Sequence, residues 1–325
     1  MGFLLPLIFA ILSLVAVALA NHAAQPAPQL YWNSILPNTQ MPRSISELLR
    51  PDSTNEEKST NIMNAVGNGK PTDHKGKPEN IPLALAIYRD YGHPTDIQLD
   101  YKNAAIFFLE KDMRPGATTN YQFPRNSNTA TFLPRESAQS IPFSSNKLSE
   151  IFNHFSVKPT SAEAKTIKQT IEACEAPGIK GEEKYCATSL ESMVDFSTSK
   201  LRTRNVQAIS TEVLEKGATM PMHKYTIIPG LKKLAGDRVV VCHKQNYPFA
   251  VFYCHAIKPT AAYVLSLKGD DGVKVKAVAI CHLDTSEWNP KHLAFQILKV
   301  KPGTIPICHF LPTDHIVWAP NHKSA

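Results

Sequence analysis

Four Cys-His dipeptides in the last third of the 325-residue chain are the residues best suited to chemistry. They are Cys242-His243, Cys254-His255, Cys281-His282 and Cys308-His309. Ten residues separate the first dipeptide from the second, and twenty-five separate each later pair of neighbours. The whole chain has only six cysteines and twelve histidines, so four adjacent pairs do not arise by chance.

The strand geometry expected around each dipeptide separates the sulfur from the imidazole. Successive side chains on a strand point to opposite faces. In residues 273–282, the small and β-branched apolar side chains share a face with Cys281, and that face can enter a core. His282 then lies on the opposite face, with Lys274 and Lys276. Four such strands predict sulfur fastening the sheet on one side and imidazoles gathered on the other.

Imidazoles gathered in this way are candidate metal ligands, since neutral imidazole suits Cu, Zn, Fe and Ni. If the cysteines are oxidised, the remaining ligands are nitrogen and oxygen, a set that favours tetragonal Cu(II). Two alternatives stay open: a structural zinc site that uses Cys and His together, and structural histidines without a metal. His292 and His315 are candidates for extra ligands, and Asp284 is a candidate to orient an imidazole.

The even number of cysteines predicts disulfide bonds, because the chain begins like an exported protein. Residues 1–20 are apolar and uncharged, and Ala18 and Ala20 provide the small residues of a cleavage site. A membrane anchor is the alternative interpretation of this run, but its Ala-x-Ala end favours cleavage. Cys174 and Cys186 are close in sequence and are expected to pair. The other four cysteines would close two bonds whose pairing stays open.

Composition restricts the expected partners. Hydrophobic residues make up 43% of the chain and charged residues 19%, the balance of a globular protein. The formal charge of +7 is spread along the chain without a dense Lys/Arg block, so nucleic acid is not an expected partner. A modest basic excess suits acidic wall polysaccharides or an anionic surface. No second long apolar run exists, so we expect no membrane partner once the signal is cleaved.

The elements that must position the dipeptides are predicted as helices followed by strands, and an irregular segment precedes them. Residues 21–99 are polar and rich in proline, and we predict a largely irregular segment with a short helix at 44–49. The folded domain is predicted at 100–320. Helical spacing comes first and a period of two follows from about residue 219, which predicts an α+β fold. Helices are expected at 145–155, 162–173 and 186–201, and strands at 103–109, 239–241, 249–253, 262–267, 273–280 and 316–318.

The spacing of the four dipeptides resembles the BURP domain of plant proteins. The resemblance covers roughly residues 100–320 and implies a disulfide-stabilised α+β domain whose strand-rich C-terminal half carries the Cys-His motifs. It also implies that 21–99 is a variable segment and that the protein comes from a plant. Supporting stretches are the residues at 31–39, 181–190, 281–286, 308–311 and 316–318.

The resemblance implies copper as the cofactor and secretion to the apoplast or cell wall, or delivery to a vacuole. The implied ligands are His243, His255, His282 and His309. One implied function is a seed, wall or stress-related role without demonstrated turnover, with wall polysaccharide as a partner.

The alternative that the resemblance implies is a copper-dependent peptide cyclase. Such an enzyme crosslinks Tyr or Trp side chains of a ribosomal precursor peptide, in cis or in trans. Residues 117–143 contain no tryptophan, which favours the role without turnover. The candidate core peptide in this chain is Leu85-Ala86-Ile87-Tyr88.

Overall fold

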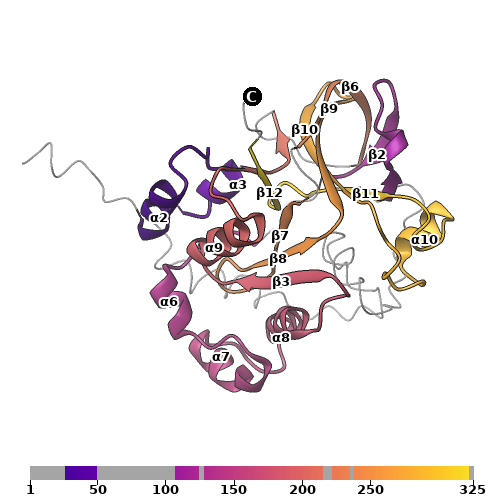
Figure 1. Cartoon of the computed structure of the whole chain (residues 1–325). Helices are drawn as coiled ribbons and strands as arrows, with labels where there is room; N and C mark the ends of the chain where they lie inside the picture. The colour runs from indigo at the N-terminus through magenta and orange to yellow at the C-terminus, as the bar shows by residue number, and fades with distance from the viewer. Residues whose placement is uncertain (1–25, 50–106, 124–127, 215–221, 235–237, 322–325) are drawn as a thin grey trace, which may run out of the picture.

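The computed structural model describes residues 26–49, 107–123, 128–214, 222–234 and 238–321. Within these ranges, short helices precede and flank two antiparallel β-sheets (Figure 1). This is the α+β fold that the segregated sequence patterns predict. The expected signal at 1–20 and the candidate core peptide at 85–88 lie outside the described residues. None of the helices in the described ranges combines the length and apolarity of a membrane-crossing segment.

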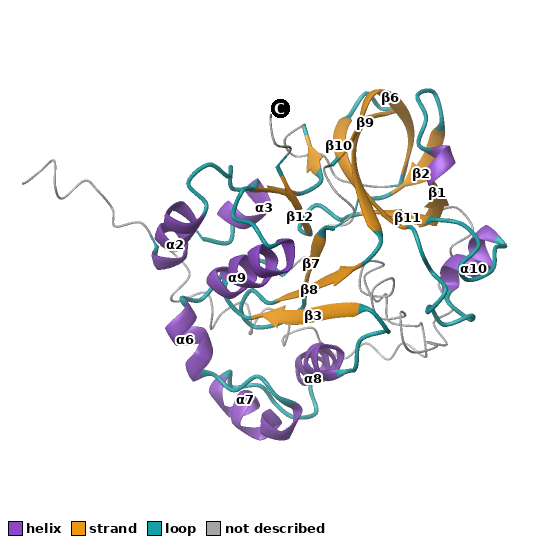
Figure 2. Cartoon of the chain, viewed as in Figure 1, coloured by secondary structure: helices purple, strands orange, loops and turns teal. Residues whose placement is uncertain are grey.

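Most helices of the described chain lie in its first part, before β4, and most strands follow them. Figure 2 shows α6, α7, α8 and α9 gathered beside the smaller sheet. The two longest are α8 (Ala162–Glu175) and α9 (Leu190–Leu201). The others are α2 (Ala27–Ile35), α3 (Arg43–Ser46), α6 (Arg135–Ser140), α7 (Leu148–His154) and α10 (Leu293–Leu298), with 3-10 turns η1 (Glu110–Asp112) and η2 (Ser145–Lys147).

The larger sheet has seven strands and curls around its own core. Its strand order is β1-β11-β10-β9-β6-β2, with β5 paired to β10. The ring of Tyr121 on β2 lies 5.1 Å from that of Phe310 on β11, so strands near opposite ends of this order meet. The bounds are β1 (Phe107–Leu109), β2 (Thr118–Tyr121), β5 (Glu212–Val213), β6 (His223–Lys233), β9 (Thr260–Gly269), β10 (Lys274–His282) and β11 (Ile307–Phe310).

The smaller sheet has five strands in the order β3-β8-β7-β12-β4. One face is covered by α9, which packs on side chains of β7, β8 and β12. The other face meets the larger sheet, where Val241 and Val317 pack with Val278 and Ile280. The two sheets therefore share a buried layer. The bounds are β3 (Glu182–Ala187), β4 (Val206–Ile209), β7 (Val240–Lys244), β8 (Phe252–Ile257) and β12 (Ile316–Pro320).

All six cysteines form disulfides, as the even count predicts. Cys174–Cys186 joins α8 to β3 and confirms the predicted pair. The other two bonds are Cys242–Cys254 and Cys281–Cys308. Each of these links residues that stand directly opposite on neighbouring antiparallel strands. Each bond therefore ties together the strands that carry two of the Cys-His dipeptides.

The helix predicted at 186–201 begins only at Leu190, because the residues before it form a strand. Residues 182–187 alternate between more and less buried side chains and pair with β8. Ser189 caps the helix: its hydroxyl accepts from the backbone N–H of Ser192 at 3.1 Å. Such a cap fixes where a helix starts more sharply than apolar spacing does.

Several shorter elements of the structure differ from those that the sequence patterns predict. The polar stretch around 117–142 contains β2 and α6. The strand expected at 249–253 begins at Phe252 and continues to Ile257, while β11 and α10 carry no clear pattern of their own. Short strands are specified by their partners rather than by local alternation.

The stretch just before residue 50 has more regular structure than its composition predicts. Residues 26–49 contribute α2 and α3 to the apolar cluster beneath α9. The Trp32 ring lies 5.4 Å from that of Trp318 on β12, and its Nε1 donates to the Thr39 carbonyl at 3.0 Å. The Tyr31 hydroxyl donates to Asp195 on α9. The side chains of Trp32 and Tyr31 attach this segment to the rest of the fold. The average composition of the segment does not reveal such single contacts.

Removing the Trp32 ring should destabilise the protein. We expect Trp32→Ala to lower the free energy of unfolding by about 3–5 kcal/mol, the cost of emptying a large buried aromatic site. Leu30→Ala is the matched control, because Leu30 lies on the same helix with 54% of its surface exposed. Urea titrations of both variants provide the measurement. Equal midpoints for the two variants would show that α2 adds nothing to the folded core.

Candidate metal centre

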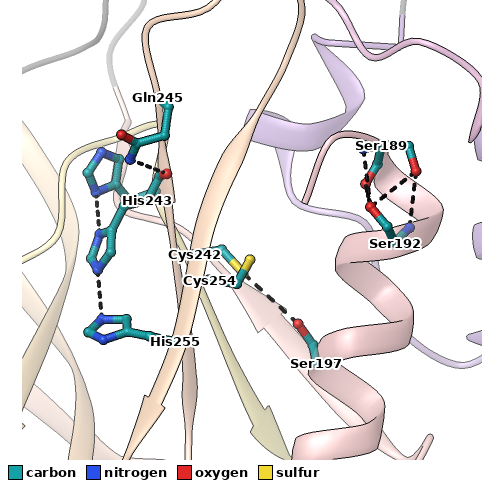
Figure 3. The surroundings of a disulfide bond; sticks show 9 residues. Ser189, Ser192, Ser197, Cys242, His243, Gln245, Cys254 and His255 are labelled. Carbon is teal, nitrogen blue, oxygen red and sulfur yellow. Dashed lines mark hydrogen bonds between the residues drawn. A yellow bond between two sulfur atoms is a disulfide. The ribbon is translucent and has the colours of Figure 1, made fainter. Parts of the chain in front are cut away.

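The histidines of all four dipeptides lie in the layer between the two sheets. On β7, His243 follows Val241 on the face that meets the larger sheet, and on β10, His282 follows Ile280. The paired cysteines point the other way, into the cores beyond the layer. Figure 3 shows this for the first two dipeptides, with the disulfide and the histidines on opposite sides of the strands. The predicted separation of sulfur from imidazole is confirmed.

His243 is the centre of a row of three imidazoles. Its Nε2 lies 3.1 Å from Nε2 of His255 on the neighbouring strand. Its Nδ1 lies 2.9 Å from Nδ1 of His315, which precedes β12. All three side chains are buried. His315 thus occupies the place of a candidate extra ligand, on the same face as Val317 of its strand.

Glu182 ends this row, and its role is not evident from the sequence. Its Oε1 accepts from His255 Nδ1 at 2.8 Å and from the Tyr253 hydroxyl at 3.1 Å. Its Oε2 accepts from the Ile179 backbone N–H at 3.0 Å. The carboxylate is only 4% exposed. No local sequence signal marks it, because its place beside His255 depends on the pairing of β3 with β8.

A second group of rings forms around His282 and His309. Their imidazoles stack with centroids 5.6 Å apart. The Trp288 ring lies 5.0 Å from that of His282, and Phe107 of β1 lies 6.4 Å from His309. His309 donates from Nδ1 to the Phe310 carbonyl at 3.2 Å if that nitrogen carries the proton, which leaves Nε2 as its ligand atom.

Two further candidates have structural roles. His292 accepts from the Ala294 N–H through Nδ1 at 3.1 Å and so caps α10. Asp284 lies at an exposed position, where it accepts from the Ser286 N–H at 2.9 Å in a tight turn. The carboxylate that orients an imidazole is Glu182 rather than Asp284.

Burial favours the neutral form of His243 and His282. It lowers the pKa of His243 and His282 well below the ordinary value, and neighbouring imidazoles lower it further. Burial also lowers the pKa of His292, His309 and His315 to about 4. Neutral imidazole is the form that binds a metal ion.

Glu182 remains ionised despite its burial. Burial alone would raise its pKa, but the donors from His255, Ile179 and Tyr253 hold it below the usual value. The site therefore holds an ionised carboxylate in direct contact with one end of the row of rings. A carboxylate that accepts from a ligand histidine is the usual partner of a metal-binding imidazole.

The donor set fits a metal that prefers nitrogen ligands. All cysteines are oxidised, so the zinc site with mixed Cys and His ligands is incompatible with the structure. Two nitrogens on one metal ion, each at about 2.0–2.1 Å, lie roughly 3 Å apart. The Nε2 atoms of His243 and His255 have this separation. Without a metal, the same atoms can share N–H···N hydrogen bonds.

A different group lies at the β9–β10 turn. His223, Asp270 and Asp271 bring their ligand atoms within 4.8 Å of one another. His223 Nδ1 lies 3.4 Å from Asp270 and its Nε2 lies 3.4 Å from Asp271, so each ring nitrogen faces its own carboxylate. Both carboxylates are exposed, and the arrangement is that of a surface ion-pair cluster.

The fold and the histidine layer define a class of plant domain. A disulfide-bonded α+β domain carries four Cys-His dipeptides on paired strands of two facing sheets. The model of the BURP domain family matches residues 106–320, and the chain belongs to this family.

Individual relatives are similar over much of the chain. BURP domain protein RD22 of Arabidopsis thaliana is 42% identical, and the match covers 98% of this chain and 99% of the relative. BURP domain-containing protein 3 of rice is 51% identical over 75% of this chain, which spans 57% of that relative. Protein RAFTIN 1B of wheat is 31% identical over 93% of each.

The buried histidines should make stability depend on pH. Their folded pKa values lie below the unfolded value near 6.5, so the unfolded chain binds more protons between pH 6.5 and about 4. The free energy of unfolding should fall as pH falls through this window, by about 1.4 kcal/mol per pH unit for each histidine.

Urea titrations across this pH window measure the effect. His309→Gln should reduce the slope of unfolding free energy against pH by the amount that corresponds to about one proton. His154→Gln is the matched control, because it makes the same substitution at an exposed position on α7. If His309→Gln left the slope of unfolding free energy against pH unchanged, the assignment of His309 as a buried neutral ring would be wrong.

Proposed function

We propose that the protein binds copper through the imidazoles of its four Cys-His dipeptides and acts outside the cytoplasm of a plant cell. The proposed ligands are His243, His255, His282 and His309. The observation that carries the proposal is the pair of Nε2 atoms of His243 and His255, 3.1 Å apart in a buried layer with no thiolate ligand. Imidazole-rich sites without thiolates favour Cu(II).

The chain's own residues would prepare such a site. The two cross-strand disulfides hold the ligand strands in register. The apolar layer next to the histidines excludes water. Bound copper supplies one-electron and oxygen chemistry that side chains lack. Trp288 and Phe107 line the side of the layer near His282 and His309.

The proposed location is the apoplast, cell wall or vacuole. The signal-like first 20 residues and the three disulfides support export, because disulfides persist in oxidising compartments. The formal charge of +7 suits an acidic wall polysaccharide as partner. We propose a seed, wall or stress-related role without turnover as the first candidate function.

The second candidate function is oxidative peptide cyclisation. It is favoured by the position of Phe107, which follows the variable segment and contacts His292 and His309. The candidate core ends at Tyr88, 19 positions earlier in the chain. Each crosslink would join the tyrosine to another side chain by loss of two hydrogen atoms. Dioxygen would accept them and become hydrogen peroxide.

Copper should bind near Trp288 and quench its fluorescence. The protein has three tryptophans, and Trp32 and Trp318 pack beyond the smaller sheet, among the side chains around Cys242. We expect Cu(II) to quench emission in the wild type and much less in Trp288→Phe, because a paramagnetic ion quenches the nearest ring. Fluorescence titration, with calorimetry for affinity, provides the measurement.

Substitution of the ligands should weaken copper binding. We expect His255→Ala and His282→Ala each to raise Kd at least tenfold, or about 1.4 kcal/mol. His154→Ala is the control for nonspecific binding to an exposed imidazole. Equal copper uptake by the wild type and by a variant that lacks all four dipeptide histidines would overturn the proposal.

Intact mass analysis separates the two candidate functions. The copper-loaded protein is incubated with dioxygen, alone and with tyrosine-containing peptides. Cyclisation predicts a loss of about 2 Da per crosslink beyond the disulfides, first at Tyr88. An unchanged mass in every reaction, with copper shown to be bound, supports the role without turnover.

A further inference from the structure

We propose that Glu182 is the positioning residue of the histidine layer, holding His255 so that its Nε2 faces His243. This inference deepens the proposed copper site and rests on it for its consequence in metal binding. An ionised carboxylate can only accept hydrogen bonds. The 2.8 Å contact between Oε1 and His255 Nδ1 therefore places a proton on Nδ1. Nε2 is then the nitrogen available to a metal, and it is the atom that faces His243.

The surroundings of Glu182 fix the carboxylate in turn. The Tyr253 hydroxyl donates to Oε1, and the Ile179 N–H donates to Oε2. Both oxygens thus have donors from different parts of the chain. The Cys174–Cys186 disulfide joins the end of α8 to β3 four residues after Glu182, so it closes the loop that contains Glu182.

Gly178 provides the space that the carboxylate needs. A Cβ at this position would lie 2.9 Å from Glu182 Oε2, closer than real Cβ contacts. Gly178 is not among the positive-φ glycines, so its backbone tolerates an L-residue. Gly178→Ala therefore displaces the carboxylate while leaving its charge in place.

The neighbouring residue offers a matched comparison. Glu183 lies next to Glu182 on β3, points to the other face and pairs with Lys200 at the surface. Glu182→Gln and Glu183→Gln make the same chemical change one position apart. Only the first change replaces the carboxylate that accepts from His255 with an amide that can either accept or donate.

The first measurement needs no metal. Nitrogen and carbon NMR shifts of the His255 ring report which nitrogen carries the proton. We expect a single Nδ1–H form in the wild type and in Glu183→Gln. In Glu182→Gln we expect a mixture, because an amide can either donate or accept. An unchanged His255 tautomer in Glu182→Gln would overturn the positioning role.

The second measurement is the Cu(II) affinity of the same variants by calorimetry. Loss of the carboxylate partner of a ligand histidine weakens metal binding 10–100-fold, which is the loss we expect for Glu182→Gln. Gly178→Ala should weaken binding in the same direction, and Glu183→Gln should not. Unchanged affinity in Glu182→Gln with wild-type binding intact would contradict the inference.

The two proposals fail in different ways. If wild-type protein binds no copper while the tautomer of His255 depends on Glu182, the copper site fails and the positioning role stands. If wild-type protein binds copper and the tautomer of His255 is unchanged in Glu182→Gln, the copper site stands and the positioning role fails. Urea midpoints and disulfide mapping of each variant show that the fold is retained.

Discussion

The alternation of side chains along a β-strand is the constraint on which this molecule depends. It places each cysteine of a Cys-His dipeptide on one face and its histidine on the other. The cysteines point into the cores beyond the two sheets, and the histidines fill the layer between them. A slip of one residue in any of the four strands would bury the imidazole in an apolar core and bring the sulfur into the layer.

The disulfides protect this arrangement at the level of strand register. Cys242 stands opposite Cys254, and Cys281 stands opposite Cys308, so each bond locks one pair of antiparallel strands. His243 and His255 are thereby kept beside each other, as are His282 and His309. The bonds lie within each sheet, and the contact between the sheets is left to apolar packing around Val241 and Ile280.

The sequence alone predicts the parts of the site that follow from local alternation. The opposed faces of sulfur and imidazole, the Cys174–Cys186 pair and the mixed fold can all be argued from spacing. The contribution of Glu182 cannot, because it depends on β3 lying beside β8, a pairing between segments about 70 residues apart. The docking of Trp32 against Trp318 depends on a contact across almost the whole chain. Long-range pairing of this kind leaves no periodic trace in the sequence.

The docking of residues 26–49 has a consequence for how the family can diversify. The backbone carbonyl of Leu48 accepts from Phe132, and Phe107 begins a strand, so the chain is attached to the fold on both sides of residues 50–106. For a flexible connection between two fixed points, the entropic cost of closure grows only with the logarithm of its length, about 0.6 kcal/mol per doubling. The alignment with the Arabidopsis relative spans 395 positions, more than the 325 residues of this chain, so that relative holds additional residues. A stretch of chain attached at both ends can therefore gain or lose whole segments over evolutionary time while the fold to which it is attached keeps nearly the same stability.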